Sequence, residues 1–267
     1  FLNSLSNNVV SCIVEDNKHN LWIGTSDGGL NYYDNASQLY KNYLFNSGNL
    51  DVPFKDIKTV YVDEVQDRIY VGAHAGGMMV LHRKSGYIEY YNRHNSNLPS
   101  NNIYSIISDG YGGLWVASLE YLLHFDIDKR NFTIVDVDGD GHKLQQYNRL
   151  LFCDSKKRIW AGGEMGISVF NQIGTSLLPN TDFQIASVLK QAFVNCFYET
   201  SSGYLWIGTR NGLFALKESD KQFLQYTTEN GLPSNVIYGI LEDAYGRLWI
   251  STNQGLSCLN SESGKFR

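Results

Sequence analysis

The chain has 267 residues, of which 43% are hydrophobic and 18% charged, and its formal net charge is −5. The 18 Tyr, 13 Phe, 5 Trp and 25 Gly against 4 Pro favour many short strands and turns around a sizeable core. With 22 Lys and Arg against 27 Asp and Glu, and no long basic run, the sequence gives no reason to expect binding to nucleic acid or to an anionic membrane.

One sequence unit recurs six times along the chain. Its marker is an aromatic residue that returns at intervals of 43 to 48 residues, at Trp22, Tyr70, Trp115, Trp160, Trp206 and Trp249. The same string surrounds each marker, as in Leu21-Trp22-Ile23-Gly24-Thr25 and Leu205-Trp206-Ile207-Gly208-Thr209. Self-similarity at this period is typical of repeat proteins.

Each unit contains four short strand patterns. The first, such as residues 236–243, is apolar and β-branched enough to be buried on both faces. A tight turn follows, with an acidic residue six positions before the marker, at Asp16, Glu64, Asp109, Asp154 and Asp243. The marker strand, a glycine turn, a third strand and a fourth strand complete the unit. Two units depart from this pattern: the third has residues 119–122 in place of the glycine turn, and the fourth lacks a clear fourth strand at 174–179.

Four antiparallel strands in roughly 45 residues predict one blade of a β-propeller. We therefore predict an all-β fold with six four-stranded blades, at about residues 7–46, 55–98, 100–142, 147–180, 192–230 and 234–267. The last unit holds only the beginning of its fourth strand, so we expect the chain to be part of a larger receptor.

Residues 235–256, Asn-Val-Ile-Tyr-Gly-Ile-Leu-Glu-Asp-Ala-Tyr-Gly-Arg-Leu-Trp-Ile-Ser-Thr-Asn-Gln-Gly-Leu, resemble the two-component regulator propeller repeat, and the first, third and fifth units match nearly as well. The resemblance covers essentially the whole chain. It implies a seven-bladed or tandem propeller in the periplasmic sensor of a Bacteroidetes hybrid histidine kinase, which responds to glycans and controls polysaccharide-utilisation genes. It also implies neighbouring propeller and signalling domains and a homodimeric receptor. No kinase signature occurs here, so we expect kinase activity to lie outside this chain.

Two sets of residues are candidates for ligand binding. Eleven positions before the marker, the first strands carry a column of polar or amphipathic residues: Ser11, Thr59, Tyr104, Arg149, Asn195 and Tyr238. The loops after the marker strands vary most between units, and they contribute His74, Tyr121 and Arg210. From both sets we expect Tyr104, Arg149, Asn195, Tyr238, His74, Tyr121 and Arg210 to contact a ligand. The alternative is that the column lines a water-filled channel and that Arg149 pairs with a neighbouring carboxylate instead of an acidic sugar.

The sequence contains no assembled catalytic or metal motif. Asp136, Asp138 and Asp140 with Gly141 resemble the start of a calcium loop, but Tyr147 stands where a bidentate Glu is needed, so an acidic turn is the preferred interpretation. The four Cys and six His have no ligand spacing, and no Gly-x-Ser-x-Gly elbow occurs. We therefore expect no cofactor and no catalysis.

These observations favour an extracytoplasmic, periplasmic sensor that binds an oligosaccharide and transmits a shift between rigid units. Two alternatives remain open. One is a propeller scaffold that docks another protein, and the other is a propeller lyase or hydrolase.

Overall fold

The computed structural model describes residues 3–43, 54–135, 148–180, 189, 191–217, 222–260 and 265–267. Apart from a short 3-10 helix at Thr228–Asn230, its regular structure is all β. The strands form six four-stranded antiparallel sheets, each with its strands in chain order. The predicted all-β fold and the six four-stranded blades are confirmed. In this described part of the chain, no helix has the length and apolarity needed to cross a membrane.

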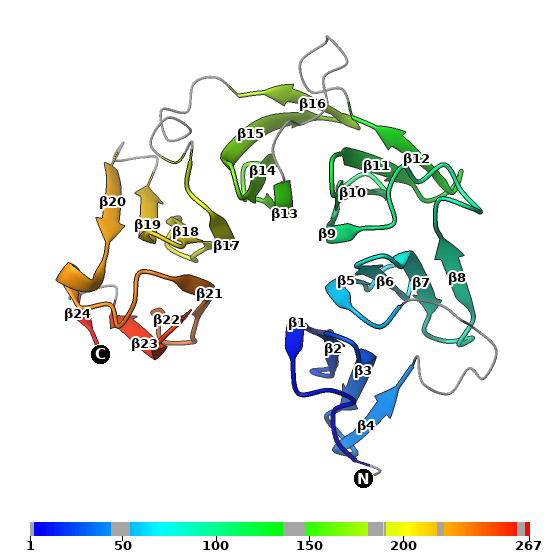
Figure 1. Cartoon of the computed structure of the whole chain (residues 1–267), viewed down its shortest axis with the longest axis horizontal. Coiled ribbons are helices and arrows are strands. Elements are labelled where there is room, and N and C mark those ends of the chain that lie inside the picture. Colours follow the sequence, from blue (N-terminus) through cyan, green and yellow to red (C-terminus); the bar gives the residue numbers. More distant parts are fainter. Residues whose placement is uncertain are drawn as a thin grey trace. The chain divides into compact units, whose positions relative to one another are not determined.

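The chain forms two compact units, Phe1–Asp136 and Val137–Arg267, with three blades in each (Figure 1). In the first unit, blade 1 contains β1 (Val10–Glu15), β2 (Leu21–Thr25), β3 (Gly29–Asp34) and β4 (Leu39–Asn42). Blade 2 contains β5 (Ile57–Asp63), β6 (Arg68–Ala73), β7 (Gly77–His82) and β8 (Ile88–Tyr91). Blade 3 contains β9 (Ile103–Ser108), β10 (Gly113–Ser118), β11 (Leu122–Asp126) and β12 (Asn131–Ile134).

The second unit has the same organisation. Blade 4 contains β13 (Asn148–Cys153), β14 (Arg158–Gly163), β15 (Gly166–Ile173) and β16 (Ser176–Pro179). Blade 5 contains β17 (Val194–Glu199), β18 (Leu205–Thr209), β19 (Gly212–Lys217) and β20 (Gln222–Tyr226). Blade 6 contains β21 (Ile237–Glu242), β22 (Arg247–Thr252), β23 (Gly255–Asn260) and β24 (Lys265–Phe266).

Blade 4 has a fourth strand, so the expectation that it lacks a clear one is wrong. Residues Ser176–Pro179 form β16, which pairs with the second half of the eight-residue β15. The strand is short and only Leu177 is buried, which is why its sequence pattern is weak.

A carboxylate organises the turn between the first two strands of a blade. In blade 1, Asp16 Oδ1 accepts the backbone N–H groups of Lys18 at 2.9 Å and Asn20 at 3.0 Å. The N–H of Asp16 donates in turn to the carbonyl of Asn20 at 2.9 Å. The same bonds recur at Asp109, Asp154 and Asp243. One side chain thereby satisfies two backbone donors that the turn would otherwise leave unpaired.

The second carboxylate oxygen explains why the acid stands six residues before the tryptophan. The Oδ2 atoms of Asp16, Asp154 and Asp243 accept the indole N–H of Trp22, Trp160 and Trp249 at 3.4, 2.8 and 3.0 Å. A buried indole N–H needs such an acceptor. The turn and the blade core are thus joined by one side chain.

Blades 3 and 5 modify this arrangement. In blade 3, His124 Nε2 lies 2.7 Å from Asp109 Oδ2, in the place that the indole takes elsewhere. In blade 5, Thr200 replaces the aspartate, and its hydroxyl lies within hydrogen-bond distance of the N–H and carbonyl of Tyr204.

In blade 2 the turn acid is Asp63, so the prediction of Glu64 is wrong. Asp63 Oδ1 accepts the backbone N–H groups of Val65 at 3.0 Å and Gln66 at 2.9 Å. This turn is one residue longer than the others, because Asp63 itself pairs with Arg68. Counting six residues back from the marker therefore falls one position too late.

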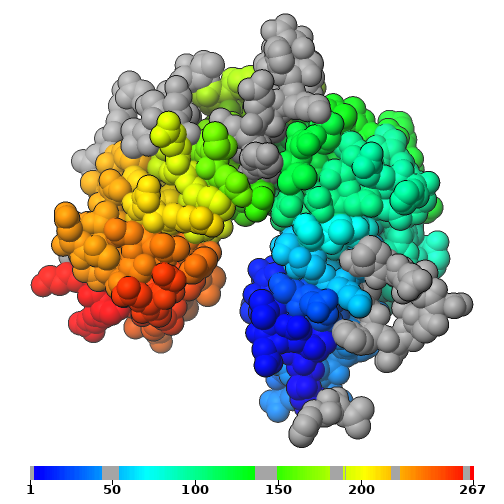
Figure 2. Space-filling model, viewed as in Figure 1, coloured from blue at the N-terminus to red at the C-terminus, as the bar shows by residue number. Residues whose placement is uncertain are grey.

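Within each unit, the first strands of successive blades contact one another, β1 with β5 and β5 with β9, and β13 with β17 and β17 with β21. We call them the inner strands. A glycine two residues after the marker permits this approach: a Cβ atom on Gly208 would lie 2.4 Å from Cys196 Sγ and 2.7 Å from Ile237 Cγ2 of the next blade. Gly24, Gly72 and Gly162 are equally crowded. Figure 2 shows the close packing of blade 1 in blue against blade 2 in cyan.

Glutamates connect neighbouring blades at their turns. Glu199 of blade 5 accepts the N–H of Ser155 in blade 4 at 2.7 Å, and Glu242 of blade 6 accepts the N–H of Ser201 in blade 5 at 2.9 Å. In the first unit, Glu64 of blade 2 accepts the N–H of Asn17 in blade 1 at 2.8 Å. We call these contacts the carboxylate clamps.

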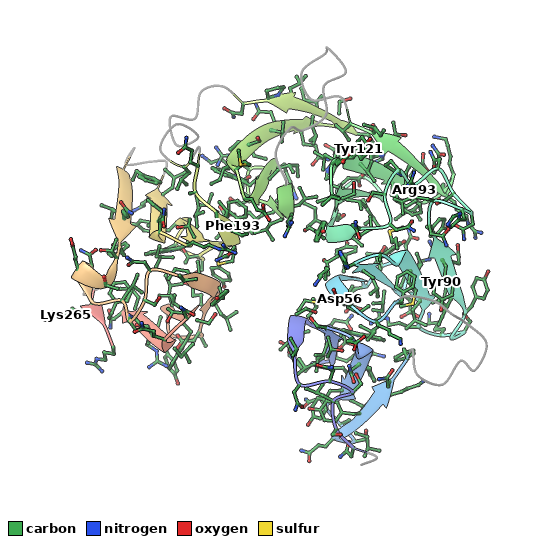
Figure 3. All side chains as sticks on the ribbon, viewed as in Figure 1. Asp56, Tyr90, Arg93, Tyr121, Phe193 and Lys265 are labelled. Atoms are coloured by element: carbon green, nitrogen blue, oxygen red, sulfur yellow. The ribbon has the colours of Figure 1, made fainter. Side chains whose placement is uncertain are left out.

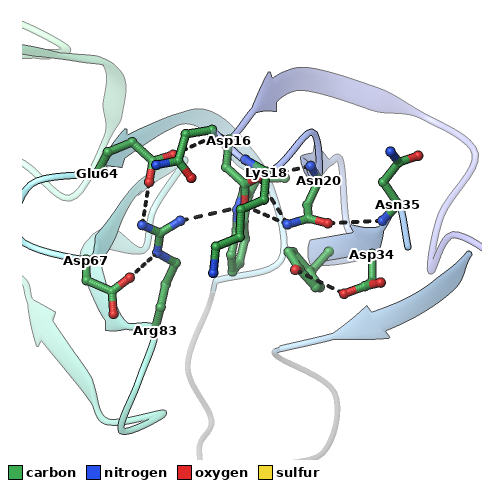
Figure 4. Close-up of polar contacts among 11 residues, drawn as sticks. Asp16, Lys18, Asn20, Asp34, Asn35, Glu64, Asp67 and Arg83 are labelled. Atoms are coloured by element: carbon green, nitrogen blue, oxygen red, sulfur yellow. Dashed lines mark hydrogen bonds and ion pairs between the residues drawn. The ribbon is translucent and has the colours of Figure 1, made fainter. Parts of the chain in front are cut away.

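Arg83 adds an ionic contact between blades 1 and 2 (Figure 4). Its guanidinium lies 2.6 Å from Glu64, 2.8 Å from Asp67 and 3.6 Å from Asp16 of blade 1. Burial alone would lower the pKa of Arg83, but the hydrogen bond and charge of Glu64 outweigh it and raise the pKa. The arginine neutralises carboxylates that the turns bring together.

The sequence predicts that the inner strands are buried on both faces, and for blade 1 this prediction is wrong. Ile13 in blade 1 is 58% exposed, whereas Val60, at the same position in blade 2, is buried. The third strands show a similar contrast: Leu256 in β23 is 62% exposed, whereas Leu213, at the same position in β19, is buried. Val60 is buried in a cluster with Trp22 and Leu30 of blade 1, and Leu213 is buried in a cluster with Ile237 and Leu248 of blade 6, so an adjacent blade of the same unit covers these two residues.

We predict that Gly208→Ala lowers the free energy of unfolding by about 1–3 kcal/mol, because the added methyl group overlaps Cys196 and Ile237. The measurement is urea unfolding monitored by tryptophan fluorescence. Ser251→Ala is the matched control, since Ser251 holds the same position in blade 6. Equal unfolding midpoints for the two variants would contradict the packing argument.

A second prediction concerns acid stability. Burial opposes ionisation of Asp243, but hydrogen bonds from Trp249 and Arg247 outweigh it and lower its pKa from 3.8 to about 2. A lowered carboxyl pKa stabilises the fold above pH 3.8, and that contribution is lost as the pH falls towards 2.

We therefore expect Asp243→Asn to unfold at lower temperature than the wild type at pH 7, with the difference shrinking below pH 3.8. Calorimetry across this pH range measures the effect. Asp27→Asn, at an exposed turn residue, serves as the control. A pH-independent difference would count against the carboxylate's role.

Candidate functional site

In each unit, the turns after the second strands lie beside the beginnings of the inner strands. The N–H of His74 donates to the carbonyl of Asp56 at 2.9 Å, and the N–H of Arg210 donates to the carbonyl of Phe193 at 3.0 Å. Gly212 N–H donates to the carbonyl of Asn235, at the start of the next blade, at 2.8 Å. These turns and strand starts define a surface in each unit that we call the turn face.

The turn face is held by backbone hydrogen bonds, so its side chains are free to differ. The residue after each second strand makes the same main-chain bond in four blades, yet it is Ser26, His74, Arg210 or Asn253. Variation on a constant backbone is the arrangement expected of a recognition surface.

A β-bulge marks the start of every inner strand. The bulged residues are Ser11, Lys58, Tyr104, Arg149, Asn195 and Tyr238. Five of them are the column identified in the sequence. In blade 2 the column residue is Lys58, so the prediction of Thr59 is wrong. The cause is again the extra residue in the blade 2 turn, which shifts the count from the marker by one position. A bulge redirects a side chain out of the strand's alternation, which accounts for polar residues in apolar strands.

The turn face of the first unit brings together charged and aromatic groups. Lys58 Nζ lies 2.8 Å from Asp56 Oδ1, and His74 Nδ1 lies 3.9 Å from Asp56 Oδ2. Tyr104 is half-buried at the second position of β9. Tyr121 packs against the core shared by blades 2 and 3. Figure 3 labels Asp56 beside β5 and Tyr121 near blade 3.

In blade 3 the turn after the second strand contains no glycine. Ser118 donates to the carbonyl of Tyr121 through its backbone N–H at 2.9 Å and its hydroxyl at 3.1 Å. Neither Leu119 nor Glu120 has a positive φ angle. The departure seen at residues 119–122 is therefore a different turn that closes the same hairpin.

The turn face of the second unit holds the other predicted residues. Arg149 Nη2 lies 2.9 Å from Glu164 Oε1, so this arginine forms an ion pair with a neighbouring carboxylate. Asn195 Nδ2 donates to the carbonyl of Ile237 in the next blade at 2.6 Å. The guanidinium carbon of Arg210 lies 3.6 Å from the ring centre of Phe193.

Tyr238 is the one predicted residue on this face that carries an aromatic ring, and it is 57% exposed. Together, the structure places His74, Tyr104 and Tyr121 on the first turn face and Arg149, Asn195, Arg210 and Tyr238 on the second.

Sequence reasoning missed Asp56, Lys58 and Phe193. Lys58 was hidden by the longer turn of blade 2. Asp56 and Phe193 hold the same position directly before the bulge region, as their backbone bonds to His74 and Arg210 show. Extending the column by two residues towards the N-terminus would have revealed Phe193, and it would have revealed Asp56 once the blade 2 column residue is Lys58.

The side chains on the turn faces are better suited to ligand binding than to catalysis. Within the described ranges, no group of three or more His, Cys, Asp or Glu side chains is placed to hold a metal ion. The calcium candidates Asp136, Asp138 and Asp140 lie outside the described residues. Burial raises the pKa of Cys12 to about 11 and that of Cys196 to about 12, so neither thiol is an activated nucleophile.

The blades and their constant turns define a β-propeller-type repeat protein. Four segments match the family model described as "Two component regulator propeller": residues 4–27, 97–120, 189–211 and 231–254. These segments fall on blades 1, 3, 5 and 6, the units whose sequences matched the repeat best. In these four segments the chain is therefore similar to the two component regulator propeller family.

Known proteins support the same relationship. The chain is 28% identical over 151 residues to histidine kinase P4 of Formosa agariphila, a match that covers 55% of this chain and 11% of that protein. The chain thus corresponds to a small part of a much longer relative.

Among solved structures, the extracellular domain of the hybrid two component system BT3049 from B. thetaiotaomicron has a TM-score of 0.73 at 22% identity. The match covers 98% of this chain and 35% of that one. PorZ, a surface component of the type-IX secretion system of Porphyromonas gingivalis, has a TM-score of 0.72 at 19% identity, over 92% of this chain and 38% of PorZ. At these identities the two structures establish a shared fold.

We predict that His74→Ala and Arg210→Ala each change the free energy of unfolding by no more than about 0.5 kcal/mol, because the turn face is held by main-chain bonds. Asn195→Ala should cost about 1 kcal/mol, since it removes a bond to the next blade. Thermal unfolding of the three variants measures this difference. A large loss for both turn variants would show that these side chains serve structure and not recognition.

Proposed function

We propose that this chain is a ligand-sensing region of a hybrid two-component regulator and that its ligand is an oligosaccharide. The observation that carries the proposal is the turn face, where one backbone arrangement presents different charged, amide and aromatic side chains from blade to blade. The family of its repeats supports the signalling context. The predicted contacts remain Tyr104, Arg149, Asn195, Tyr238, His74, Tyr121 and Arg210.

The chemistry of these side chains fits a carbohydrate. Amides, carboxylates and guanidinium groups exchange hydrogen bonds with hydroxyl groups, and exposed tyrosines offer apolar surfaces to sugar rings. Binding at such a face transmits a signal by favouring one arrangement of rigid units over another.

We further propose that the region lies in the periplasm, next to further propeller and signalling domains of a homodimeric receptor whose kinase lies outside this chain. The extracellular location of the related B. thetaiotaomicron domain supports the compartment. The exposed Ile13 in the first unit and the exposed Leu256 in the second each support a further neighbouring blade, because the matching residues Val60 and Leu213 are covered by a neighbouring blade of their own unit. Glu15 holds the position of the clamp residues Glu199 and Glu242, is 55% exposed, and pairs with His19 of its own turn instead of with another blade.

Exposed apolar residues in blade 6 favour one alternative, a propeller scaffold that docks another protein through Leu241 and Leu256. A lyase or hydrolase has less support, because the charged groups on the turn faces are paired with one another instead of being arranged around a reacting atom.

Isothermal calorimetry with a broad oligosaccharide panel tests the proposal. We predict that Tyr238→Ala weakens binding about tenfold, the effect of losing one aromatic contact of about 1 kcal/mol or slightly more. Tyr245→Ala is the matched control: Tyr245 is 84% exposed in the same blade but lies in the turn at the opposite end.

If no oligosaccharide of the panel binds and a protein partner binds instead, the chain is a docking scaffold and the proposed sensor function is wrong. Equal weakening by both tyrosine variants would remove the turn face from the proposal.

A further inference from the structure

A polar cavity lies at the outer edge of the first unit, away from its turn face. It has a volume of about 560 Å³ and lies between β8 of blade 2 and the start of β12 of blade 3. Its lining includes Tyr87, Glu89, Asn97, Arg130 and Asn131. Tyr90 of β8 marks this edge in Figure 3, at the far side of blade 2 from Asp56. We call it the outer groove.

A fixed carboxylate forms the base of the outer groove. The side chain of Glu89 is 12% exposed, and its oxygens lie 2.7 Å from the hydroxyl of Tyr91 and 2.7 Å from His82 Nε2. Burial opposes ionisation, but the hydrogen bonds from Tyr91 and His82 outweigh it and lower the pKa of Glu89. The groove therefore presents an anionic acceptor in one orientation.

The guanidinium of Arg130 lies beside the Glu89 carboxylate but forms no direct hydrogen bond with it. Arg130 Nη1 lies 3.6 Å from Glu89 Oε2, which is longer than a hydrogen bond, and the arginine side chain is 62% exposed. Arg130 lies in the tight turn directly before β12, where its φ is 55°. Acceptor and donors are thus adjacent and open to a third group.

The walls of the groove are fixed by hydrogen bonds. Asn97 pairs with the backbone of Phe132 through both ends of its amide, at 2.5 and 3.0 Å. Asn95 Nδ2 donates to the carbonyl of Tyr90 at 2.8 Å. Because these amides are already engaged, the shape of the groove exists before any ligand arrives, which lowers the entropic cost of binding.

An exposed aromatic ring completes the outer groove. Tyr87 is 59% exposed, and its ring centre lies 5.5 Å from that of His82, the histidine that holds Glu89. Asn131, which is also exposed, adds an amide to the lining. The groove combines an apolar ring with a carboxylate, a guanidinium and an amide.

We propose that the outer groove binds a neutral sugar unit, separate from the turn faces. One hydroxyl donates to Glu89 while its neighbour accepts from Arg130, and the apolar face of the sugar ring lies on Tyr87. The opposite charges of Glu89 and Arg130 cancel, so neither an anionic nor a cationic ligand gains from the site. The choice of a sugar rests on the function proposed above, whereas the location rests on the groove itself.

Calorimetry and saturation-transfer NMR on the full chain, with a panel of short neutral oligosaccharides, test this inference. We expect Tyr87→Ala and Arg130→Ala each to weaken binding of a panel member at least tenfold. Tyr87→Phe should retain most of the affinity, because it keeps the ring. Tyr111→Ala, at a 68% exposed tyrosine in the turn between β9 and β10, is the matched control.

The outcomes separate the two proposals. Binding that is unchanged in Tyr87→Ala and Arg130→Ala but weakened in Tyr238→Ala overturns the outer groove and leaves the turn face in place. The absence of binding by any panel member up to about 10 mM, the limit of weak specific recognition, overturns both. Circular dichroism and thermal unfolding of each variant confirm that a loss of affinity is not a loss of fold.

Discussion

The structure depends on one interaction, the aspartate that closes the first turn of a blade. Its Oδ1 atom accepts two backbone N–H groups, and its Oδ2 atom accepts the indole N–H of the tryptophan six residues later. The carboxylate thus fixes the turn and the core of the blade at the same time. Blade 3 keeps the turn through Asp109, with His124 in place of the indole, and blade 5 keeps it through Thr200, so the backbone geometry of the turn is retained when the partners change.

The same turn also connects blades. The residues after Asp16, Asp154 and Thr200 donate their N–H groups to a glutamate of the next blade; they are Asn17, Ser155 and Ser201. At the other end of the blade, glycine brings inner strands together and main-chain bonds hold the turn face. Since structure is carried by backbone, carboxylate and glycine, the remaining side chains are available for recognition, both on the turn faces and in the outer groove.

The sequence predicts the blades well because each is a local unit with its own marker, turn and strands. It fails where a single inserted residue shifts the count, so Thr59 and Glu64 were chosen where Lys58 and Asp63 hold the positions. It also fails where partners come from different strands or blades. The pairing of Arg149 with Glu164, the cluster around Arg83 and the outer groove all depend on contacts that repeat spacing does not encode.

The most direct test of this account is backbone hydrogen exchange in the turns after the inner strands. The N–H groups of Asn17, Ser155 and Ser201 lie in exposed turns but are clamped by glutamates, so they should exchange as slowly as amides within the strands. Ala244 holds the same position in blade 6, and its N–H has no hydrogen-bond partner among the described residues, so it should exchange rapidly. Equally fast exchange at all four amides would contradict the claim that carboxylates hold the blades together.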